Sequence, residues 1–186
     1  MKKLLLHACC APCGAYSAKF LAQQGYDVTF YFYNPNIFPK DEYKRRLDEL
    51  IRFANDEKFS LIVAEPDFEE WNLAVIGHEN APEKGSRCHI CYKMRLAHTA
   101  KYAKENGFDA FTTTLSISPH KSYEMISEIS RELEKALGIQ YLDVNLKKQD
   151  GFKKSLELSR LYGFYRQDYC GCKYSKQMRE NQSRAF

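Results

Sequence analysis

The chain has 186 residues, enough for one domain with a hydrophobic core and too few for two domains of ordinary size. Its formal net charge of +4 at pH 7 permits an anionic partner such as RNA without requiring one. The apolar run near the N-terminus stops at His7, so it is far too short for an export signal or a membrane span. We therefore expect a cytoplasmic protein with no membrane partner, in a reducing compartment where structural disulfides are rare.

Short apolar runs alternate with helical patterns along almost the whole chain. Runs rich in β-branched or aromatic residues predict strands at residues 4–7, 28–33, 61–64, 110–117 and 141–144. Helical periodicity predicts helices at residues 15–24, 39–56, 88–106, 123–137 and 152–162. Glycines stand where helix ends favour a left-handed residue, at positions 25, 107, 138 and 163. The longest connection, residues 67–87, has room for a further helix or a mobile lid.

This alternation indicates the α/β class: a single domain, residues 1–186, with a mostly parallel sheet flanked by helices on both faces. Such a sheet resembles the Rossmann-like group that includes ATP-pyrophosphatases. Residues 9–14 occupy the place of the phosphate-binding loop of that group but are not Gly-rich, which disfavours an ATP-dependent reaction.

Ligands of such sheets bind beyond the carboxyl ends of the strands. The unusual residues of this chain follow predicted strands there. They are Cys9, Cys10 and Cys13 after the first strand, Asn34-Pro35-Asn36 after the second, and residues 116–120 after the fourth.

The seven cysteines form three groups: Cys9-Cys10-Ala11-Pro12-Cys13, Cys88-His89-Ile90-Cys91 and Cys170-Gly171-Cys172. A C-x-x-C at a helix start places two thiols one turn apart, where free backbone N–H groups favour thiolates. Two such thiols and the tandem pair together supply four thiolates, which suit structural zinc or an iron–sulfur cluster. Zinc leaves three cysteines without a role, and scattered buried thiols are the third interpretation.

The remaining cysteines have several possible roles. Cys170 and Cys172 can close a small, easily reduced disulfide ring that takes part in catalysis, or they can coordinate a metal. Cys13 is a candidate ligand of a second metal, a proton donor or a plain buried thiol. Asp168, just before this pair, is a candidate iron ligand or proton donor, against the simpler interpretation of an exposed loop carboxylate.

A family resemblance rests on motifs spread over nearly the whole chain. They are His7-Ala8-Cys9-Cys10-Ala11-Pro12-Cys13, Asn34-Pro35-Asn36-Ile37, Glu42-Tyr43, Arg87-Cys88 with Cys91-Tyr92, Thr112 to Ser118, and Tyr165 to Cys172. Together they resemble epoxyqueuosine reductases of the cobalamin-independent, queuosine-H type. The tandem Cys-Cys-x-Pro-Cys together with the terminal Tyr-Cys-Gly-Cys is far more specific than a lone C-x-x-C.

The resemblance implies an enzyme that reduces the epoxide of epoxyqueuosine, at the wobble position of tRNA, to the cyclopentene of queuosine. It also implies a [4Fe–4S] cluster, a redox-active disulfide and room for one additional iron. The implied cluster ligands are Cys9, Cys10, Cys88 and Cys91, and the implied disulfide joins Cys170 to Cys172. The sequence identifies neither the electron donor nor the ligands of a second iron.

A tRNA substrate requires basic and aromatic side chains at its binding pocket, because the modified nucleotide must be unstacked from its neighbours before it can enter the pocket. Three basic clusters are candidates, each with solvated helix faces as the alternative: Lys44-Arg45-Arg46; Lys147, Lys148, Lys153 and Lys154; and Arg166, Lys173, Lys176 and Arg179. The last adjoins the terminal cysteines, so we expect the segment of about residues 165–186 to pack near the metal site. Tyr92 is a candidate neighbour of the cluster, His120 is a better candidate proton donor than His7, and His7 reads as a core histidine.

Two other functions fit the sequence less completely. A zinc-stabilised RNA-binding module without catalysis leaves the terminal cysteine pair without a purpose. An iron–sulfur enzyme that transfers sulfur to tRNA needs a nucleotide-activating loop, which the sequence lacks.

Overall fold

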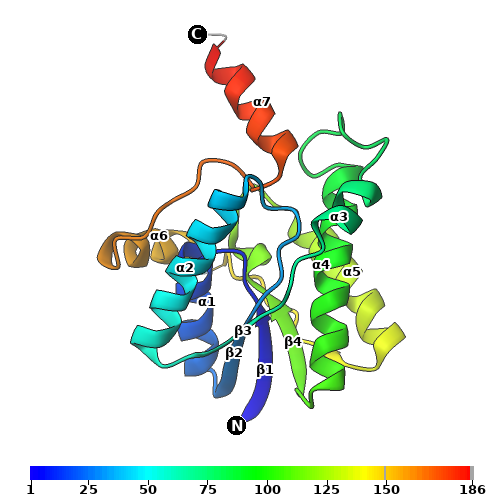
Figure 1. The fold of residues 1–186 in the computed structure, drawn as a ribbon. Coiled ribbons are helices and arrows are strands. Elements are labelled where there is room, and N and C mark those ends of the chain that lie inside the picture. Colours follow the sequence, from blue (N-terminus) through cyan, green and yellow to red (C-terminus); the bar gives the residue numbers. More distant parts are fainter. Residues whose placement is uncertain (149, 185–186) are drawn as a thin grey trace.

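The computed structural model describes residues 1–148 and 150–184, which form one five-stranded sheet with helices on both faces (Figure 1). The strand order is β3-β2-β1-β4-β5, and every neighbouring pair is parallel. In the middle, Leu5 of β1 pairs with Thr29 of β2 and Phe111 of β4. The strands are β1 (Lys2–His7), β2 (Tyr26–Phe32), β3 (Ser60–Val63), β4 (Ala110–Thr113) and β5 (Gln140–Tyr141).

The central strand supplies side chains to both hydrophobic cores, because successive residues of a strand point to opposite faces. Leu4 and Leu6 are buried against α1 (Ala11–Gln23), α2 (Lys40–Glu57) and α6 (Gly151–Leu161). Leu5 is buried on the other face against α4 (Ser86–Glu105) and α5 (Tyr123–Leu137). This arrangement confirms the predicted single α/β domain and its Rossmann-like sheet.

The first core is close-packed where α1 crosses the sheet. A methyl group added at Gly14 would lie 3.2 Å from both the Phe30 ring and the Leu50 side chain. Glycine therefore allows α1 to approach β2 and α2 closely. This contact holds the start of α1, and the cysteines on it, at the carboxyl end of β1.

Three regions differ from the sequence-based expectations. The predicted strand over residues 110–117 ends at Thr113, whose hydroxyl accepts a hydrogen bond from the Leu115 N–H and begins the 3₁₀ helix η1 (Thr114–Ile117). The predicted strand over residues 141–144 ends at Tyr141. The third region, helix α7 (Lys173–Arg184), was not predicted. The 67–87 connection contains a helix, as one of the two expectations had it: α3 (Phe68–Ala74), capped by Asp67.

Helix α7 projects from the rest of the domain near the carboxyl ends of the strands (Figure 1). Residues 185–186, the end of the predicted C-terminal segment, lie outside the described residues. Among the described residues, no helix combines the length and apolar sequence needed to cross a bilayer.

Candidate metal and redox centre

A cleft of about 590 Å³ opens beyond the carboxyl ends of β1 and β4. The strand order reverses between these two strands, which is where ligands bind in open α/β sheets. Side chains from the starts of α1 and α4, from the segment after β4 and from the C-terminal segment line the cleft. All three cysteine groups contribute to its wall.

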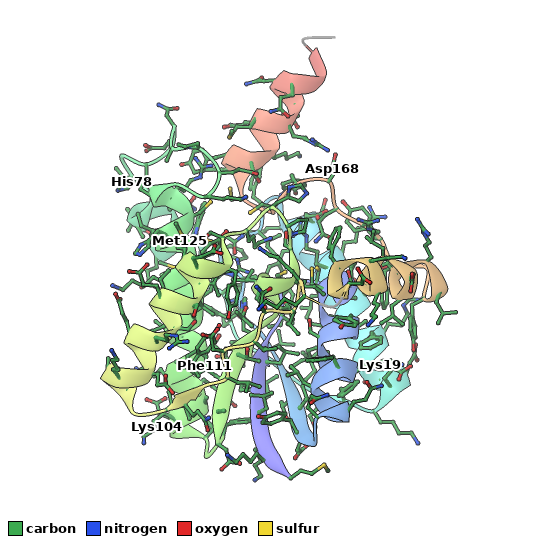
Figure 2. All side chains as sticks on the ribbon, turned by 180° about the vertical axis from the view of Figure 1, so that it is seen from behind. Lys19, His78, Lys104, Phe111, Met125 and Asp168 are labelled. Atoms are coloured by element: carbon green, nitrogen blue, oxygen red, sulfur yellow. The ribbon has the colours of Figure 1, made fainter. Side chains whose placement is uncertain are left out.

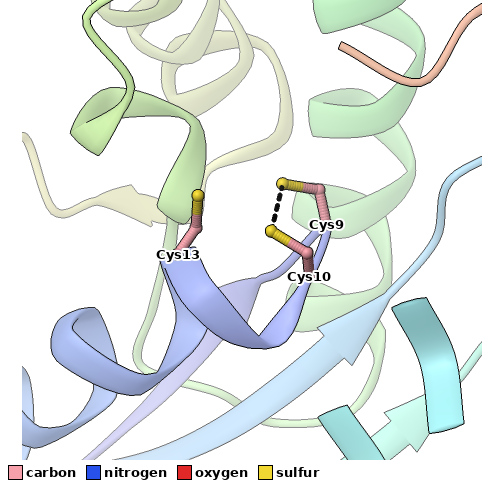
Figure 3. Close-up of side chains that lie close together, drawn as sticks. All are labelled: Cys9, Cys10 and Cys13. Carbon is pink, nitrogen blue, oxygen red and sulfur yellow. Dashed lines mark hydrogen bonds between the residues drawn. The ribbon is translucent and has the colours of Figure 1, made fainter. Parts of the chain in front are cut away.

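The first group lies at the start of α1, with its three sulfur atoms gathered above the helix (Figure 3). The three sulfurs lie within 4.8 Å of one another, and the Sγ atoms of Cys9 and Cys10 are 3.8 Å apart. Cys10 is the N-cap of α1, and Pro12 lies in the first helical turn, where its missing N–H leaves no hydrogen bond unmade. The turn after β1 therefore aims Cys9, Cys10 and Cys13 at one point.

The second group lies in the first two turns of α4. Cys88 and Cys91 stand three residues apart on this helix, so both face the same side. Cys88 packs against the apolar cluster that contains the first cysteine group. Cys91 is buried against Trp71 and Cys172.

The third group lies in the loop that precedes α7. Cys170 and Cys172 both line the cleft, and each thiol shifts the pKa of the other. Gly171 between them has φ of +124°, a conformation that favours glycine. All seven cysteines are free thiols in this structure.

A buried ion pair on α2 holds this loop in place. Arg46 is 2 % exposed and donates from Nε to Glu42 at 2.6 Å. Its other nitrogens donate to the carbonyls of Cys170 at 3.2 Å and Tyr169 at 3.3 Å. The Phe38 N–H donates to the Gly171 carbonyl at 2.8 Å, so the loop is bound on two sides. Arg46 is therefore structural, and its prediction as part of an RNA-contacting cluster is wrong.

A second buried arginine lies on the opposite side of the site. Arg95 is 1 % exposed and stands one helical turn after Cys91, to whose sulfur it donates at 3.8 Å. Its Nη2 donates to Asn34 Oδ1 at 2.6 Å. The Asn34 amide in turn donates to the carbonyl of Ala8 at 2.9 Å, immediately before the tandem cysteines.

Two cations influence Cys9 in the first cysteine group. Hydrogen bonds from Cys10 and Cys13, assisted by the charges of Lys121 and Arg95, hold the pKa of Cys9 well below its usual range in spite of burial. Lys121 lines the cleft after β4. The first group is thus a set of coupled thiols in which Cys9 ionises most readily.

The C-terminal pair shows the same asymmetry. A hydrogen bond from Cys172 lowers the pKa of the Cys170 thiol, and the same two cations lower it further. The hydrogen bond raises the pKa of Cys172. By contrast, burial raises the pKa of Cys88 and Cys91. A low-pKa thiol beside a second thiol is the usual arrangement of a reactive dithiol.

Other predicted residues take positions around this centre. Tyr92 is buried at the cleft wall, and its pKa is raised, first by burial and then by the neighbouring thiols. His120 and Asp168 are exposed at the cleft, and Asp168 lies near the base of α7 (Figure 2). Of the C-terminal cations, Arg166 and Arg179 line the cleft.

His7 is a core histidine, as predicted. It is fully buried between Thr113, 2.9 Å from Nδ1, and the Tyr33 carbonyl, 3.2 Å from Nε2. The carbonyl can only accept, so Nε2 carries the proton and the Thr113 hydroxyl donates to Nδ1. Burial and the charge of Arg95 lower the pKa of His7 to about 3, which keeps the ring neutral.

Sequence reasoning missed Arg95, Lys121 and Gln167, whose side chain donates to Cys10 Sγ at 3.1 Å. Only Arg95 could have been found from the sequence, because a residue four positions after a cysteine on a helix lies beside that cysteine. The positions of Lys121 and Gln167 depend on contacts between distant segments.

The residues present fit an iron–sulfur group. Thiolates are the ligands of such clusters, and three sulfurs already converge here with Cys88 packed beside them. Arg95 and Lys121 supply positive charge next to these thiols, and the buried Nε of Arg95 has no partner among the described residues.

Known proteins match this chain over most of its length. The profile described as "Epoxyqueuosine reductase QueH" matches residues 4–178. A protein named Epoxyqueuosine reductase QueH from Acinetobacter baylyi is 44 % identical over 174 residues, covering 93 % of this chain and 80 % of its own. A protein of the same name from Thermotoga maritima is 35 % identical over 178 residues, covering 94 % and 91 %.

Solved structures share the fold at low identity. The "U34-tRNA thiolase NcsA from Methanococcus maripaludis with its [4Fe-4S] cluster" has a TM-score of 0.59 at 10 % identity, covering 98 % of this chain and 66 % of its own. A structure titled predicted subunit of tRNA methyltransferase, from Methanocaldococcus jannaschii, has a TM-score of 0.58 at 19 % identity, covering 86 % and 75 %. These likenesses support the fold, and the profile and sequence matches show that the chain belongs to the epoxyqueuosine reductase QueH family of oxidoreductases.

Proposed function

We propose that this protein reduces the epoxide of epoxyqueuosine at the wobble position of tRNA to give queuosine, in the cytoplasm. The observation that carries the proposal is the convergence of three cysteine groups on one cleft at the switch point of the sheet. Family membership supplies the substrate class.

Cys9, Cys10, Cys88 and Cys91 are the proposed ligands of a [4Fe–4S] cluster, and Cys13 and Asp168 are candidates for one additional iron. The packing of Cys88 against the first group supports this set. The short distances of Cys13 to Cys9 and Cys10 make it the alternative fourth ligand. When bound, such a cluster supplies one-electron transfer at a low potential.

The Cys170–Cys172 pair is the proposed source of the two electrons. Oxidation of two thiols to a disulfide releases two electrons and two protons. Loss of an epoxide oxygen as water, leaving an alkene, consumes two of each. The reaction therefore balances as epoxide and dithiol giving alkene, water and disulfide. An external donor, still unidentified, then reduces the disulfide. The lowered pKa of Cys170 and the position of both thiols in the cleft wall support this role.

The cleft and its cations are the proposed binding site for the unstacked nucleotide. A volume of about 590 Å³ lies in the range of small-molecule sites. Arg166 and Arg179 at its wall and Lys173 and Lys176 on α7 are the candidates for contacts with RNA phosphates. His120 and Lys121 stand at the same cleft as candidate proton donors.

The test begins with metal analysis of anaerobically purified protein. About four sulfides with four or five irons per chain, together with loss of epoxide from modified tRNA, would support the proposal. Stoichiometric zinc without sulfide after anaerobic reconstitution would overturn it and favour a zinc-stabilised RNA-binding module. Cys170→Ser and Cys172→Ser should keep the iron and abolish turnover. Full turnover in both variants would refute the redox role of the pair.

A further inference from the structure

Arg95 is a buried cation without a carboxylate. Its side chain is 1 % exposed, and no carboxylate among the described residues forms an ion pair with it. Its two hydrogen-bond acceptors are a neutral amide oxygen of Asn34 and the Cys91 sulfur. The buried Nε has no acceptor at all among the described residues.

Burying a guanidinium without an anion is strongly unfavourable, since its hydration is lost and nothing replaces it. The anionic groups that act on Arg95 in this structure are thiols: Cys91, Cys9 and Cys170, one from each cysteine group. The positive charge of Arg95 therefore faces the cysteine centre without a carboxylate to neutralise it.

Arg95 also connects two of the three cysteine groups mechanically. One end of its guanidinium contacts Cys91 on α4, and the other end contacts Asn34 after β2. Asn34 holds the Ala8 carbonyl, one residue before Cys9. All of these side chains are buried, so the chain of hydrogen bonds that links α4 to the β1–α1 turn is short and rigid.

We propose that Arg95 is the positioning residue and built-in counter-cation of the cysteine centre, and that it sets the reduction potential of an iron–sulfur group held there. This inference rests on the proposed function. An N–H···S hydrogen bond and a nearby positive charge both stabilise the reduced, more negative form of a cluster, so they make the potential less negative. Arg95 supplies both at once, and Asn34 orients it without neutralising it.

The test compares reduction potentials at matched cluster content. Wild type, Arg95→Lys and Arg95→Gln are reconstituted anaerobically, and each is titrated with reductant while visible absorption and electron paramagnetic resonance are recorded. Arg95→Gln should shift the midpoint to a more negative potential, and Arg95→Lys should shift it less because the charge remains. Lys93→Gln, which removes an exposed charge from the same helix, should leave the midpoint unchanged.

A second variant covers the case in which Arg95→Gln does not hold a cluster. Asn34→Asp keeps the arginine and places a carboxylate where the amide oxygen now accepts from it. It should also shift the midpoint to a more negative potential. Clusters at full content with unchanged midpoints in Asn34→Asp and Arg95→Lys would overturn the inference. A wild-type protein without sulfide would instead refute the proposed function itself.

Discussion

Of the three fully buried arginines among the described residues, Arg46 and Arg95 lie on opposite sides of the cysteine centre, and their partners differ. Arg46 on α2 pairs with the Glu42 carboxylate at 2.6 Å, and its Nη1 and Nη2 donate hydrogen bonds to loop carbonyls. Arg95 on α4 has an amide and a thiol as partners. The charge of Arg46 is thus paired with a carboxylate of the protein, whereas the charge of Arg95 has no carboxylate partner among the described residues.

The two arginines therefore have different roles at the cysteine centre: one holds the backbone, and the other supplies charge to the thiols. The Arg46 side fixes the backbone around Cys170 and Gly171, so that the terminal thiols stay at the cleft whatever their charge. The Arg95 side requires negative charge from the centre itself. Substitutions near Arg46 should therefore change stability first, and substitutions near Arg95 should change electronic properties first.

The largest effect is expected from removing a sulfur that Arg95 contacts. Cys91→Ser should lose most of the bound iron and sulfide and all reductase activity, because a hydroxyl replaces a proposed thiolate ligand. Iron, sulfide and epoxide loss from tRNA are the measurements. Cys13→Ser is the matched variant and should keep the [4Fe–4S] cluster. The reverse result would replace Cys91 by Cys13 in the ligand set.

Breaking the buried ion pair should have the next largest effect. Glu42→Gln leaves Arg46 without a carboxylate and should lower the free energy of unfolding by about 3 kcal/mol. The measurement is urea unfolding of reduced, cluster-free protein. Asp48→Asn removes the carboxylate of the exposed Lys44 pair on the same helix and should change stability by less than about 0.5 kcal/mol. Equal effects from the two variants would contradict the structural role of Arg46.

A smaller effect is expected at the turn between the terminal cysteines. Gly171→Ala should destabilise the protein by about 1–3 kcal/mol, because φ is +124° and the new methyl group would lie 3.1 Å from Arg46 Nη1. It should also alter the rate at which Cys170 and Cys172 form a disulfide, measured by thiol labelling. Gly163→Ala is the control, since φ there is +61° but the added methyl group meets nothing within 4 Å. An unchanged rate in Gly171→Ala would show that the turn does not set the thiol geometry.

The smallest effect concerns the ion pair of an exposed arginine, Arg131, which shows how little an exposed pair contributes to stability compared with a buried one. Burial acts to raise the pKa of Asp143, but hydrogen bonds from Tyr123, Ser127 and Arg131 outweigh it and lower the pKa. Asp143 therefore adds stability above the unfolded-state pKa, and this contribution is lost as the pH falls through the lower folded-state pKa. Asp143→Asn should cost about 1 kcal/mol at pH 7, because Arg131 is largely exposed, and less near pH 3.

Urea unfolding of Asp143→Asn at both pH values checks this expectation. A destabilisation that is the same at pH 7 and at pH 3 would show that the charge of Asp143 contributes nothing.

The sequence by itself determined the fold class and the location of the chemistry. Alternating patterns place five strands in a parallel sheet, and the first two cysteine motifs follow a strand end or begin a predicted helix, so their arrival at one edge follows from the topology. Glycines at positions 25, 107, 138 and 163 were predicted to be left-handed, and all four have positive φ. Helix α7 was not predicted because its sequence is mostly polar, and Tyr174 and Met178 alone do not make a continuous apolar stripe.

Only the tertiary structure decided which charges serve the scaffold and which serve the site. Lys44-Arg45-Arg46 reads as one basic cluster, yet Arg46 is buried because its partners are the carbonyls of residues 169 and 170, more than 120 positions later. Arg95 meets Asn34 across 61 positions. Hydrophobic periodicity describes a residue's own element, whereas the burial and pairing of a charge depend on segments that meet only when the chain has folded.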